Sequence, residues 1–281
     1  MNQTARWSGT AGQAWIDAQA MLDELFQPFE DLLVDEVAAV GAGSVLDVGC
    51  GTGSTTVAVA RRLGGGGAGC VGVDIAEPMV AAARARAERA GVPVAFVHAD
   101  AQEHGFAPAG FDAVISRFGV MFFADPVRAF ANLRRAATPG AALRAVVWRG
   151  VAENPFMTTA ERAAAPLVPD LPVRRPDEPG QFAFADPERV RDILARAGWD
   201  GVDLRPVDVA CVLPEHDLVR YFTRLGPLGM VLGGADEQTR ARVVDTVRAA
   251  FDPYVHGDEV RFTAACWQVD AAAPNGTRET A

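Results

Sequence analysis

The chain has 281 residues, 49% of them hydrophobic, which is enough to form a large buried core. With 36 acidic residues against 26 Lys and Arg, its formal net charge is -10, and the basic residues are scattered. A nucleic-acid binder needs clustered Lys and Arg to neutralise phosphates, so this charge disfavours nucleic acid as a partner. Four cysteines lie far apart without a Cys-x-x-Cys pair, which fits neither a zinc site nor a disulfide framework and indicates free thiols in a reducing compartment: Cys50, Cys70, Cys211 and Cys266.

Targeting and membrane segments are not visible in the sequence. The first 20 residues contain charged side chains and no apolar run, so they do not resemble a signal peptide. No run of about 18 apolar residues is present to cross a bilayer. The sequence therefore predicts a cytoplasmic protein without a membrane span, either a monomer or a homodimer.

The first 40 residues are predicted to be helical. Apolar residues recur at helical spacing across Trp15–Val40, which indicates one or two amphipathic helices with a break near Pro28. We expect this part of the chain to form a lid.

From residue 44 to 148, short apolar runs alternate with Ala- and Arg-rich stretches of helical periodicity. Most strand residues are apolar, as expected for strands buried on both faces of a parallel sheet. Pro78 and Pro126 suit the first turn of a helix. The predicted strands are Val45–Val48, Cys70–Val73, Val94–His98, Ala113–Ser116 and Ala142–Trp148, and the predicted helices are Thr55–Leu63, Pro78–Ala90 and Pro126–Ala136.

Residues beyond 150 complete the predicted domain plan. A helix capped by Asp186 follows a proline-rich segment, and two more strands are expected at Val202–Leu213 and Val260–Val269. The plan is an α/β fold, a Rossmann-like doubly wound sheet of seven, mostly parallel strands. Its units are an N-terminal helical lid at 1–40, a core at 41–213 with a proline-rich lid segment at 151–180, a helical cap at 214–258, a last core strand at 259–270 and a disordered tail at 271–281.

The strongest sequence signal is the glycine-rich run Val45-Leu46-Asp47-Val48-Gly49-Cys50-Gly51-Thr52-Gly53. A predicted strand enters this turn and a predicted helix leaves it. Glycines allow a tight turn and let a ligand approach the backbone without meeting a Cβ atom. The loop lies at the carboxyl end of the first strand, where open α/β sheets bind ligands, although a tight connection without a ligand would also use glycines.

Two aspartates mark the ends of the next two predicted strands. Asp74 lies roughly 20 residues beyond the glycine loop, where a carboxylate can accept hydrogen bonds from both hydroxyls of a ribose. Asp100 follows the third strand, where an acidic side chain can meet an adenine amino group. Either residue alone could be a helix cap or a turn residue. Together with the glycine loop, they predict a nucleoside-binding site.

The glycine spacing bears on which nucleoside is bound. The dinucleotide fingerprint is G-x-G-x-x-G, but the glycines here are Gly49, Gly51 and Gly53, and the position that the fingerprint requires is Ser54. The carboxylate of Asp47, two residues before the first glycine, disfavours a pyrophosphate but suits a ligand with an ammonium and a sulfonium. Both features argue against a nicotinamide dinucleotide.

These segments resemble the class I S-adenosylmethionine-dependent methyltransferases, within the group similar to ubiquinone- and menaquinone-biosynthesis methyltransferases. The glycine loop resembles the first motif of that group, residues 74–79 the second and residues 99–101 the third. Residues 111–116 resemble its fourth strand, and residues 133–148 its fifth element. The resemblance covers about residues 44–148, and the rest of the chain shares only the layout of the group.

The resemblance implies S-adenosyl-L-methionine as the cofactor and a set of residues around it. The methionine part would lie beside Asp47, Gly49, Gly51 and Gly53, and the ribose would be held by Asp74. The adenine would lie against Ile75, Met79, Asp100 and Ala101, and the sulfonium close to Ser116 and Arg117.

The acceptor side is implied more loosely. After the fourth strand the substrate site would begin with Phe118, Met121 and Phe122, although aromatic residues at such spacing are also typical of a core. Trp15 belongs to an N-terminal segment of the kind that folds over the cofactor in related enzymes, and Phe222 lies in the predicted cap.

Methyl transfer is an SN2 displacement at a carbon that the sulfonium already activates, so the protein mainly aligns the reacting groups and excludes water. A general base is needed only when the nucleophile must lose a proton. The sequence shows no clear base; His216 and Tyr221 are weak candidates, and no spacing of His, Asp and Glu indicates a metal. We therefore expect a small aromatic or quinone-like acceptor with an O, N or C nucleophile.

Two other functions stay open at this point. A nucleotide-dependent oxidoreductase could use a similar sheet, but Ser54 and Asp47 argue against it. A cofactor-binding protein that has lost catalysis could serve as a partner or regulator, and the intact cofactor positions argue against that. Fold alone does not decide between these functions.

Overall fold

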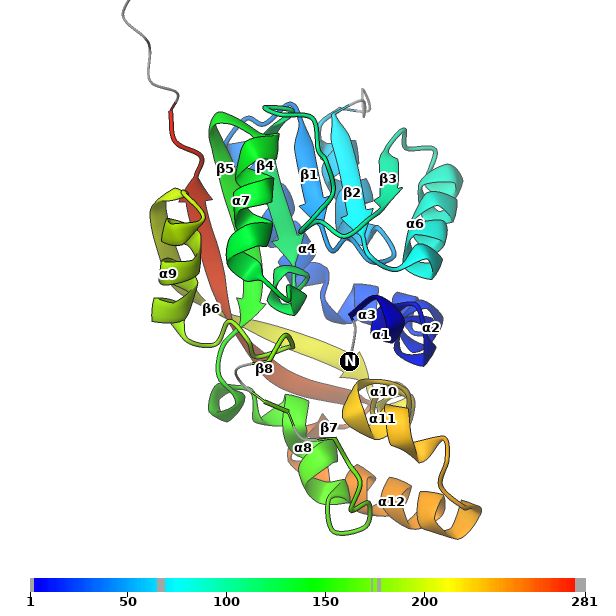
Figure 1. The fold of residues 1–281 in the computed structure, drawn as a ribbon. Helices are drawn as coiled ribbons and strands as arrows, with labels where there is room; N and C mark the ends of the chain where they lie inside the picture. Colours follow the sequence, from blue (N-terminus) through cyan, green and yellow to red (C-terminus); the bar gives the residue numbers. More distant parts are fainter. Residues whose placement is uncertain (1–2, 65–68, 173, 176–177, 276–281) are drawn as a thin grey trace, which may run out of the picture.

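The computed structural model describes residues 3–64, 69–172, 174–175 and 178–275, and a single β-sheet runs through it (Figure 1). The strand order is β3-β2-β1-β4-β5-β8-β6, and a short β7 pairs with β8 at the side. The sheet confirms the predicted doubly wound α/β fold, with β7 as an unforeseen eighth strand. The strands are β1 (Val45–Val48), β2 (Cys70–Asp74), β3 (Ala95–His98), β4 (Phe111–Arg117), β5 (Ala137–Trp148), β6 (Asp200–Pro214), β7 (Val255–His256) and β8 (Glu259–Ala272).

The parallel half of the sheet places the glycine loop at its centre. β1 pairs in parallel with β2 on one side and β4 on the other, so that Leu46 lies opposite Val71 and Val114. All four β1 residues are buried, and three of them are apolar, as expected for a strand covered on both faces; the fourth is Asp47. Because these strands are parallel, their carboxyl ends lie at the same edge of the sheet.

Helices cover both faces of this half, each beginning where the sequence provides a start signal. α5 (Ser54–Arg62), α6 (Glu77–Ala90), α7 (Pro126–Ala136) and α9 (Pro187–Arg196) follow the predicted helices closely. The side chain of Asp125 caps α7 by accepting from the Arg128 backbone N–H, and Asp186 caps α9 in the same way through Glu188. Gly91, with a φ of 64°, ends α6.

The N-terminal region contains four helices: α1 (Gln3–Trp7), α2 (Thr10–Asp17), α3 (Gln19–Leu25) and α4 (Gln27–Ala39). The last three overlap Trp15–Val40, where one or two helices were expected. The chain bends at Ala18 and Phe26, not at Pro28. Pro28 lies in the first turn of α4, where its missing N–H has no intrahelical partner to lose. α4 buries Phe29 and Leu33 against the sheet.

β6 and β8 reach past the end of β5 and carry a helical cap (Figure 1). β8 pairs with β5 only as far as Cys266, and its remaining residues pair with β6 down to Pro214 opposite Glu259. The cap helices on this extension are α8 (Pro155–Ala164), α10 (Leu218–Arg224), α11 (Gly226–Leu232) and α12 (Glu237–Ala250).

Helix α8 corrects the expected domain boundaries. The segment 151–180 was expected to be a proline-rich lid, but Pro155 occupies the first turn of α8, where proline is tolerated. The ring of Phe156 stacks on Phe262 of β8 at 3.8 Å and meets Phe251, at the end of α12, at 5.1 Å. The cap therefore draws on residues 155–164 as well as 214–258.

The C-terminal end of the last strand also differs from the prediction. The predicted tail began at residue 271, but Ala271 and Ala272 belong to β8, and Ala272 lies opposite Ala142 of β5. The backbone N–H of Ala273 donates to Ala141 at 2.8 Å, so pairing with the sheet continues there. The remainder of the predicted tail, from residue 276, lies outside the described residues.

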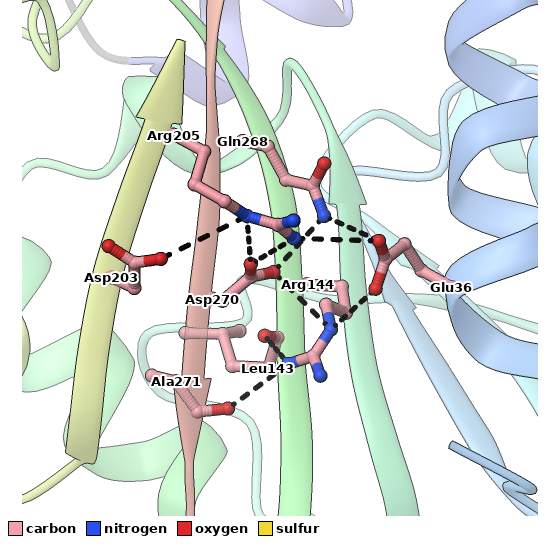
Figure 2. A network of polar contacts seen from close by, with 8 residues as sticks. All are labelled: Glu36, Leu143, Arg144, Asp203, Arg205, Gln268, Asp270 and Ala271. Atoms are coloured by element: carbon pink, nitrogen blue, oxygen red, sulfur yellow. Dashed lines mark hydrogen bonds and ion pairs between the residues drawn. The ribbon is translucent and has the colours of Figure 1, made fainter. Parts of the chain in front are cut away.

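A polar network ties α4 to the antiparallel side of the sheet (Figure 2). Nε of Arg144 on β5 lies 3.0 Å from Glu36 of α4 and 3.3 Å from Asp270 of β8. Arg205 of β6 lies 2.6 Å from Asp270, and the Gln268 amide donates to Glu36 at 2.8 Å. Burial alone would raise the pKa of Glu36, but hydrogen bonds from Gln268 and Arg144 more than offset this, so its pKa is lowered.

Candidate functional site

A cavity of about 270 Å³ lies where the carboxyl ends of the parallel strands, the N-terminal helices and the cap meet. It is lined by nine of the predicted cofactor residues: Asp47, Gly49, Gly51, Asp74, Ile75, Met79, Asp100, Ala101 and Arg117. Its other predicted lining residues are Trp15, Phe118, Met121, Tyr221, Phe122 and Phe222. One cavity thus joins the expected cofactor and acceptor regions.

The glycine loop approaches the β4 connection too closely for side chains. A Cβ atom added to Gly49, whose φ is +68°, would lie 2.7 Å from the Cα of Gly119. Gly51 also has a positive φ, of +55°, with open space beside it. Gly53 faces away from the cavity, since an added Cβ would meet Phe96 and Ala83 at 2.8 and 2.9 Å. Gly53 therefore allows the loop to pack against Phe96 and Ala83, and its position does not support the predicted contact with the cofactor.

Asp74 shapes the loop as well as the cavity. Its Oδ2 accepts from the Gly51 N–H at 2.9 Å and its Oδ1 from the Ala76 N–H at 2.9 Å. Burial raises the pKa of Asp74, and these backbone hydrogen bonds offset part of that increase. Each carboxylate oxygen keeps a second lone pair, so the side chain can hold the loop and still accept from a ligand hydroxyl.

Asp47 is a buried carboxylate beside the loop. Its side chain is 2% exposed, and it accepts a hydrogen bond of 2.6 Å from the Thr56 hydroxyl. Burial raises its pKa to about 6, although Thr56 and the positive charge of Arg117 act in the opposite direction. A cationic ligand in the cavity would supply the missing charge.

Thr55 provides a test of fit for a polar ligand. Thr55 lines the cavity, and its buried hydroxyl has no hydrogen-bond partner among the described residues. It lies in the first turn of α5, where backbone N–H groups also lack intrahelical partners. A ligand with a polar group here would satisfy an atom that the protein leaves unpaired, since an orphaned buried hydroxyl costs free energy.

The two residues expected near the sulfonium lie in different environments. Arg117 lines the cavity, donates to Ser54 Oγ at 2.7 Å and lies 4.0 Å from Glu30 of α4. Ser116 is 1% exposed and is not among the lining residues. Its hydroxyl donates to the Val48 carbonyl at 2.8 Å and so joins β4 to β1. This position does not support the role predicted for Ser116. Successive strand residues point to opposite faces of a sheet, and of these two residues it is Arg117 that lines the cavity.

The loop after β3 is fixed by polar contacts that the sequence did not reveal. The Asp100 carboxylate accepts from the backbone N–H of Gln102 at 2.9 Å, which forms a tight turn. Asn132 of α7 donates to the Ala101 carbonyl at 2.8 Å. The placement of Asp100 in the cavity wall therefore depends on a helix about 30 residues further along the chain.

The start of the acceptor side is built on a strained residue. Phe118 has a φ of +61°, in the left-handed region that bulky residues rarely adopt. Its ring stacks on Trp148 at 4.5 Å with an interplanar angle of 10°, and it meets Phe26, between α3 and α4, at 5.4 Å. Strain of this kind is found at functional sites more often than elsewhere.

The N-terminal helices close one side of the cavity. Trp7 meets Trp15 edge to face at 5.8 Å and Phe122 at 5.2 Å. Arg86 of α6 lies 2.6 Å from Asp23 of α3, which fastens the N-terminal region to the core. These contacts place the aromatic residues of α1 and α2 over the loop after β4.

The two weak candidates for a base differ in position. His216 lies in the short helix η3 (Glu215–Asp217), its side chain is 81% exposed, and it is not among the lining residues. This position does not support a catalytic role for His216, because the surface turn directs its side chain to solvent. Tyr221 lines the cavity, and its hydroxyl contacts Met157 Sδ at 3.7 Å. Burial raises the pKa of Tyr221, so it is a hydrogen-bond donor rather than a base.

Residues 45–140 match the family model described as a methyltransferase domain. This stretch contains β1, the glycine loop, Asp74 and Asp100, which line the cavity. Residues 45–140 are a methyltransferase domain. The matched domain is about a third of the chain, and the N-terminal helices and the cap lie outside it.

Two curated relatives share the methyltransferase domain. Demethylmenaquinone methyltransferase of Thermus thermophilus is 41% identical over 99 residues, which is 35% of this chain and 44% of the relative. Aklanonic acid methyltransferase DauC of Streptomyces sp. strain C5 is 37% identical over 111 residues, or 39% of this chain and 50% of the relative. The matched stretches thus span about half the length of these relatives.

Solved structures share the fold over most of the chain. The solved structure of a Bacillus halodurans protein named as a methyltransferase has a TM-score of 0.55 at 17% identity; the match covers 86% of this chain and 99% of that protein. The [4+2]-cyclase SpnF has a TM-score of 0.52 at 23% identity and covers 88% of this chain and 81% of its own. Because a cyclase shares it, this fold alone does not fix the reaction.

Neither a membrane-spanning helix nor a metal-binding cluster is present among the described residues. None of the helices in that part of the chain is long and apolar enough to cross a membrane. Within the same residues, no group of three His, Cys, Asp or Glu side chains is placed to hold a metal ion.

Proposed function

We propose that this protein is an S-adenosylmethionine-dependent methyltransferase that transfers a methyl group to a small, flat, mainly apolar acceptor. The observation that carries the proposal is the cavity itself. On one side it has the glycine loop and the strand-end carboxylates, and on the other the aromatic residues of the cap. A cofactor and an acceptor in one cavity would meet without intervening solvent.

The cofactor would be held by residues of the methyltransferase domain. Asp74 would accept from the ribose hydroxyls, and Ile75 and Met79 would flank the adenine. Asp47 would face the positively charged methionine end, where Thr55, with its orphaned hydroxyl, also lies in the wall. When bound, the cofactor would supply a methyl group that its sulfonium activates for displacement.

The protein's own part in the reaction would be alignment and exclusion of water. Phe118, Met121 and Phe222 give the acceptor side an apolar wall, which suits a flat ring. Tyr221 would donate a hydrogen bond to the acceptor. The acceptor nucleophile would be an O, N or C atom that is already electron-rich, such as a phenolate oxygen. The names of the two curated relatives support a small-molecule acceptor.

Transfer of a labelled methyl group tests this function. The protein would be incubated with methyl-labelled S-adenosylmethionine and a panel of phenols, hydroxyquinones and aromatic amines. We expect label in an organic-soluble product for at least one acceptor and none with the Asp74→Ala variant. Binding of the cofactor with no labelled product across the panel would contradict the proposal and favour a cofactor-binding protein without catalysis.

A further inference from the structure

The cap side of the cavity contains an ion pair that the sequence analysis did not single out. Glu161 of α8 and Arg174, in the loop that leads to α9, both line the cavity. Nε of Arg174 donates to the two carboxylate oxygens of Glu161 at 3.1 and 2.8 Å. Their side chains are only 16% and 23% exposed. The surrounding wall is mainly apolar: Phe156, Met157, Ala160, Phe222, Leu228 and Phe251.

Stability of the fold does not account for this pair. Removing two charges from water costs as much free energy as their attraction returns, and apolar residues often hold such a position equally well. The guanidinium is also fixed from other sides. Its Nη1 donates to Gln181, and the ring of Phe182 lies 5.5 Å from its central carbon. A polar group held rigidly in an apolar cavity is the arrangement that ligand recognition requires.

Both side chains of the pair line the cavity, next to the start of α11. Gly226, with a φ of +70°, has no side chain, and an added Cβ would lie 3.8 Å from both Arg174 Nη2 and Glu161 Oε1. Nη1 and Nη2 of a guanidinium each carry a second N–H, and a carboxylate has further lone pairs. The pair therefore presents donors and acceptors side by side, with no net charge.

We propose that the Glu161–Arg174 pair recognises the acceptor and selects an uncharged aromatic molecule with a hydroxyl or carbonyl group. This inference rests on the proposed function, because it assigns the acceptor to the cap side of the same cavity. A carboxylate could accept from Arg174 only by bringing a second negative charge beside Glu161, and a ring without a polar group would cover the remaining donors and acceptors without satisfying them. Tyr221, which also lines the cavity, adds a further donor.

Three ligands of equal ring size test the inference: 1-naphthol, 1-naphthoate and naphthalene. Their binding would be measured by titration calorimetry at pH 7 with the protein saturated by S-adenosylhomocysteine. We expect wild-type protein to bind 1-naphthol about tenfold more tightly than either of the others, since one charge-assisted hydrogen bond has about this effect.

Two variants separate recognition from folding. Glu161→Gln leaves the Arg174 charge uncompensated, so we expect it to bind 1-naphthoate about tenfold more tightly than wild type does. Arg174→Met should lose the preference for 1-naphthol. The matched control is Glu178→Gln, which removes the carboxylate of an exposed ion pair with Arg175 in the same segment. It should behave as wild type.

The outcomes are distinguishable from failure of the proposed function. The increased affinity of Glu161→Gln for 1-naphthoate is a gain that misfolding does not produce. Equal binding of the three ligands to wild type, binding of none of them, or no gain in the Glu161→Gln variant would overturn the inference. Failure of wild type to bind S-adenosylhomocysteine at all would instead contradict the proposed function.

Discussion

Burial of the Asp47 carboxylate beside the cavity lowers the free energy of unfolding of the ligand-free protein at neutral pH. Its carboxylate is buried, and its pKa is raised from an ordinary value of 3.8 to about 6. A raised carboxyl pKa means that the folded state binds the proton more tightly than the unfolded state. This contribution to stability is therefore present below pH 4 and is lost as the pH rises to about 6.

Replacing Asp47 by Asn removes this pH dependence. The difference between about 6 and 3.8 corresponds to about 3 kcal/mol at neutral pH. We expect Asp47→Asn to raise the free energy of unfolding by about 1–3 kcal/mol at pH 7 and by much less at pH 4. Urea unfolding at both pH values measures this. A gain that is equal at the two pH values would show that the Asp47 charge is not the cause.

Neighbouring threonines of α5 give a second prediction at this scale. Thr55 has an unpaired buried hydroxyl, whereas the Thr56 hydroxyl donates to Asp47. We expect Thr55→Val to raise the free energy of unfolding by about 1 kcal/mol and to weaken cofactor binding. Thr56→Val should lower the free energy of unfolding by about 1–3 kcal/mol. Urea unfolding and calorimetry of the two variants measure these effects, and changes of the same sign in stability would contradict the assignment.

Single residues of the site were predictable where the chain itself places them. Asp47 and Asp74 belong to buried strands that end at one edge of the sheet, so their convergence follows from the strand pattern. Ser116 and His216 are not among the residues that line the cavity. The sequence does not indicate which way a strand end faces, nor that residues 215–217 form a surface turn. Glu161 meets Arg174 only through packing of a helix against a later loop, which no spacing reveals.

Among the elements, the network of α4, β5, β6 and β8 gives a testable contribution to stability (Figure 2). Arg144 is 18% exposed and lies between Glu36 and Asp270, which are 22% and 15% exposed. Without Arg144, two partly buried carboxylates would be left with Arg205 and the Gln268 amide as their partners. We expect Arg144→Met to lower the free energy of unfolding by about 2–4 kcal/mol.

The control for this variant is an exposed ion pair. Arg191 and Glu188 on α9 have side chains 40% and 79% exposed, so Arg191→Met should change stability by less than about 0.5 kcal/mol. Both variants would be compared by urea unfolding at neutral pH. Equal effects of the two would show that the network does not hold α4 to the sheet.

The elements themselves were predictable to different degrees. The strands of the parallel half were found because burial on both faces leaves an apolar run. Helix α8 was missed because six prolines between residues 151 and 180 outweighed its helical periodicity, although Pro155 starts the helix. The three helices that overlap Trp15–Val40 were merged into one or two, since Ala18 and Phe26 carry no helix-breaking signal.

The whole molecule combines a methyltransferase domain with two additions that close its cavity. The N-terminal helices come before the matched residues 45–140, and the cap comes after them. Sequence resemblance predicted the domain and the residues on the glycine-loop side of its cavity. The side proposed for the acceptor depends on how the β6 and β8 extension carries the cap back to the cavity, which is a property of the tertiary structure.

Binding of S-adenosylmethionine, measured by titration calorimetry, tests the central claim most directly. We expect a micromolar dissociation constant for wild type and binding about 10–100-fold weaker for Asp74→Asn, which keeps one oxygen for the loop but loses a charged acceptor. Asp192→Asn, on the exposed face of α9, should bind as wild type does. The absence of binding to wild type, or equal binding by Asp74→Asn, would contradict the assignment of the cavity.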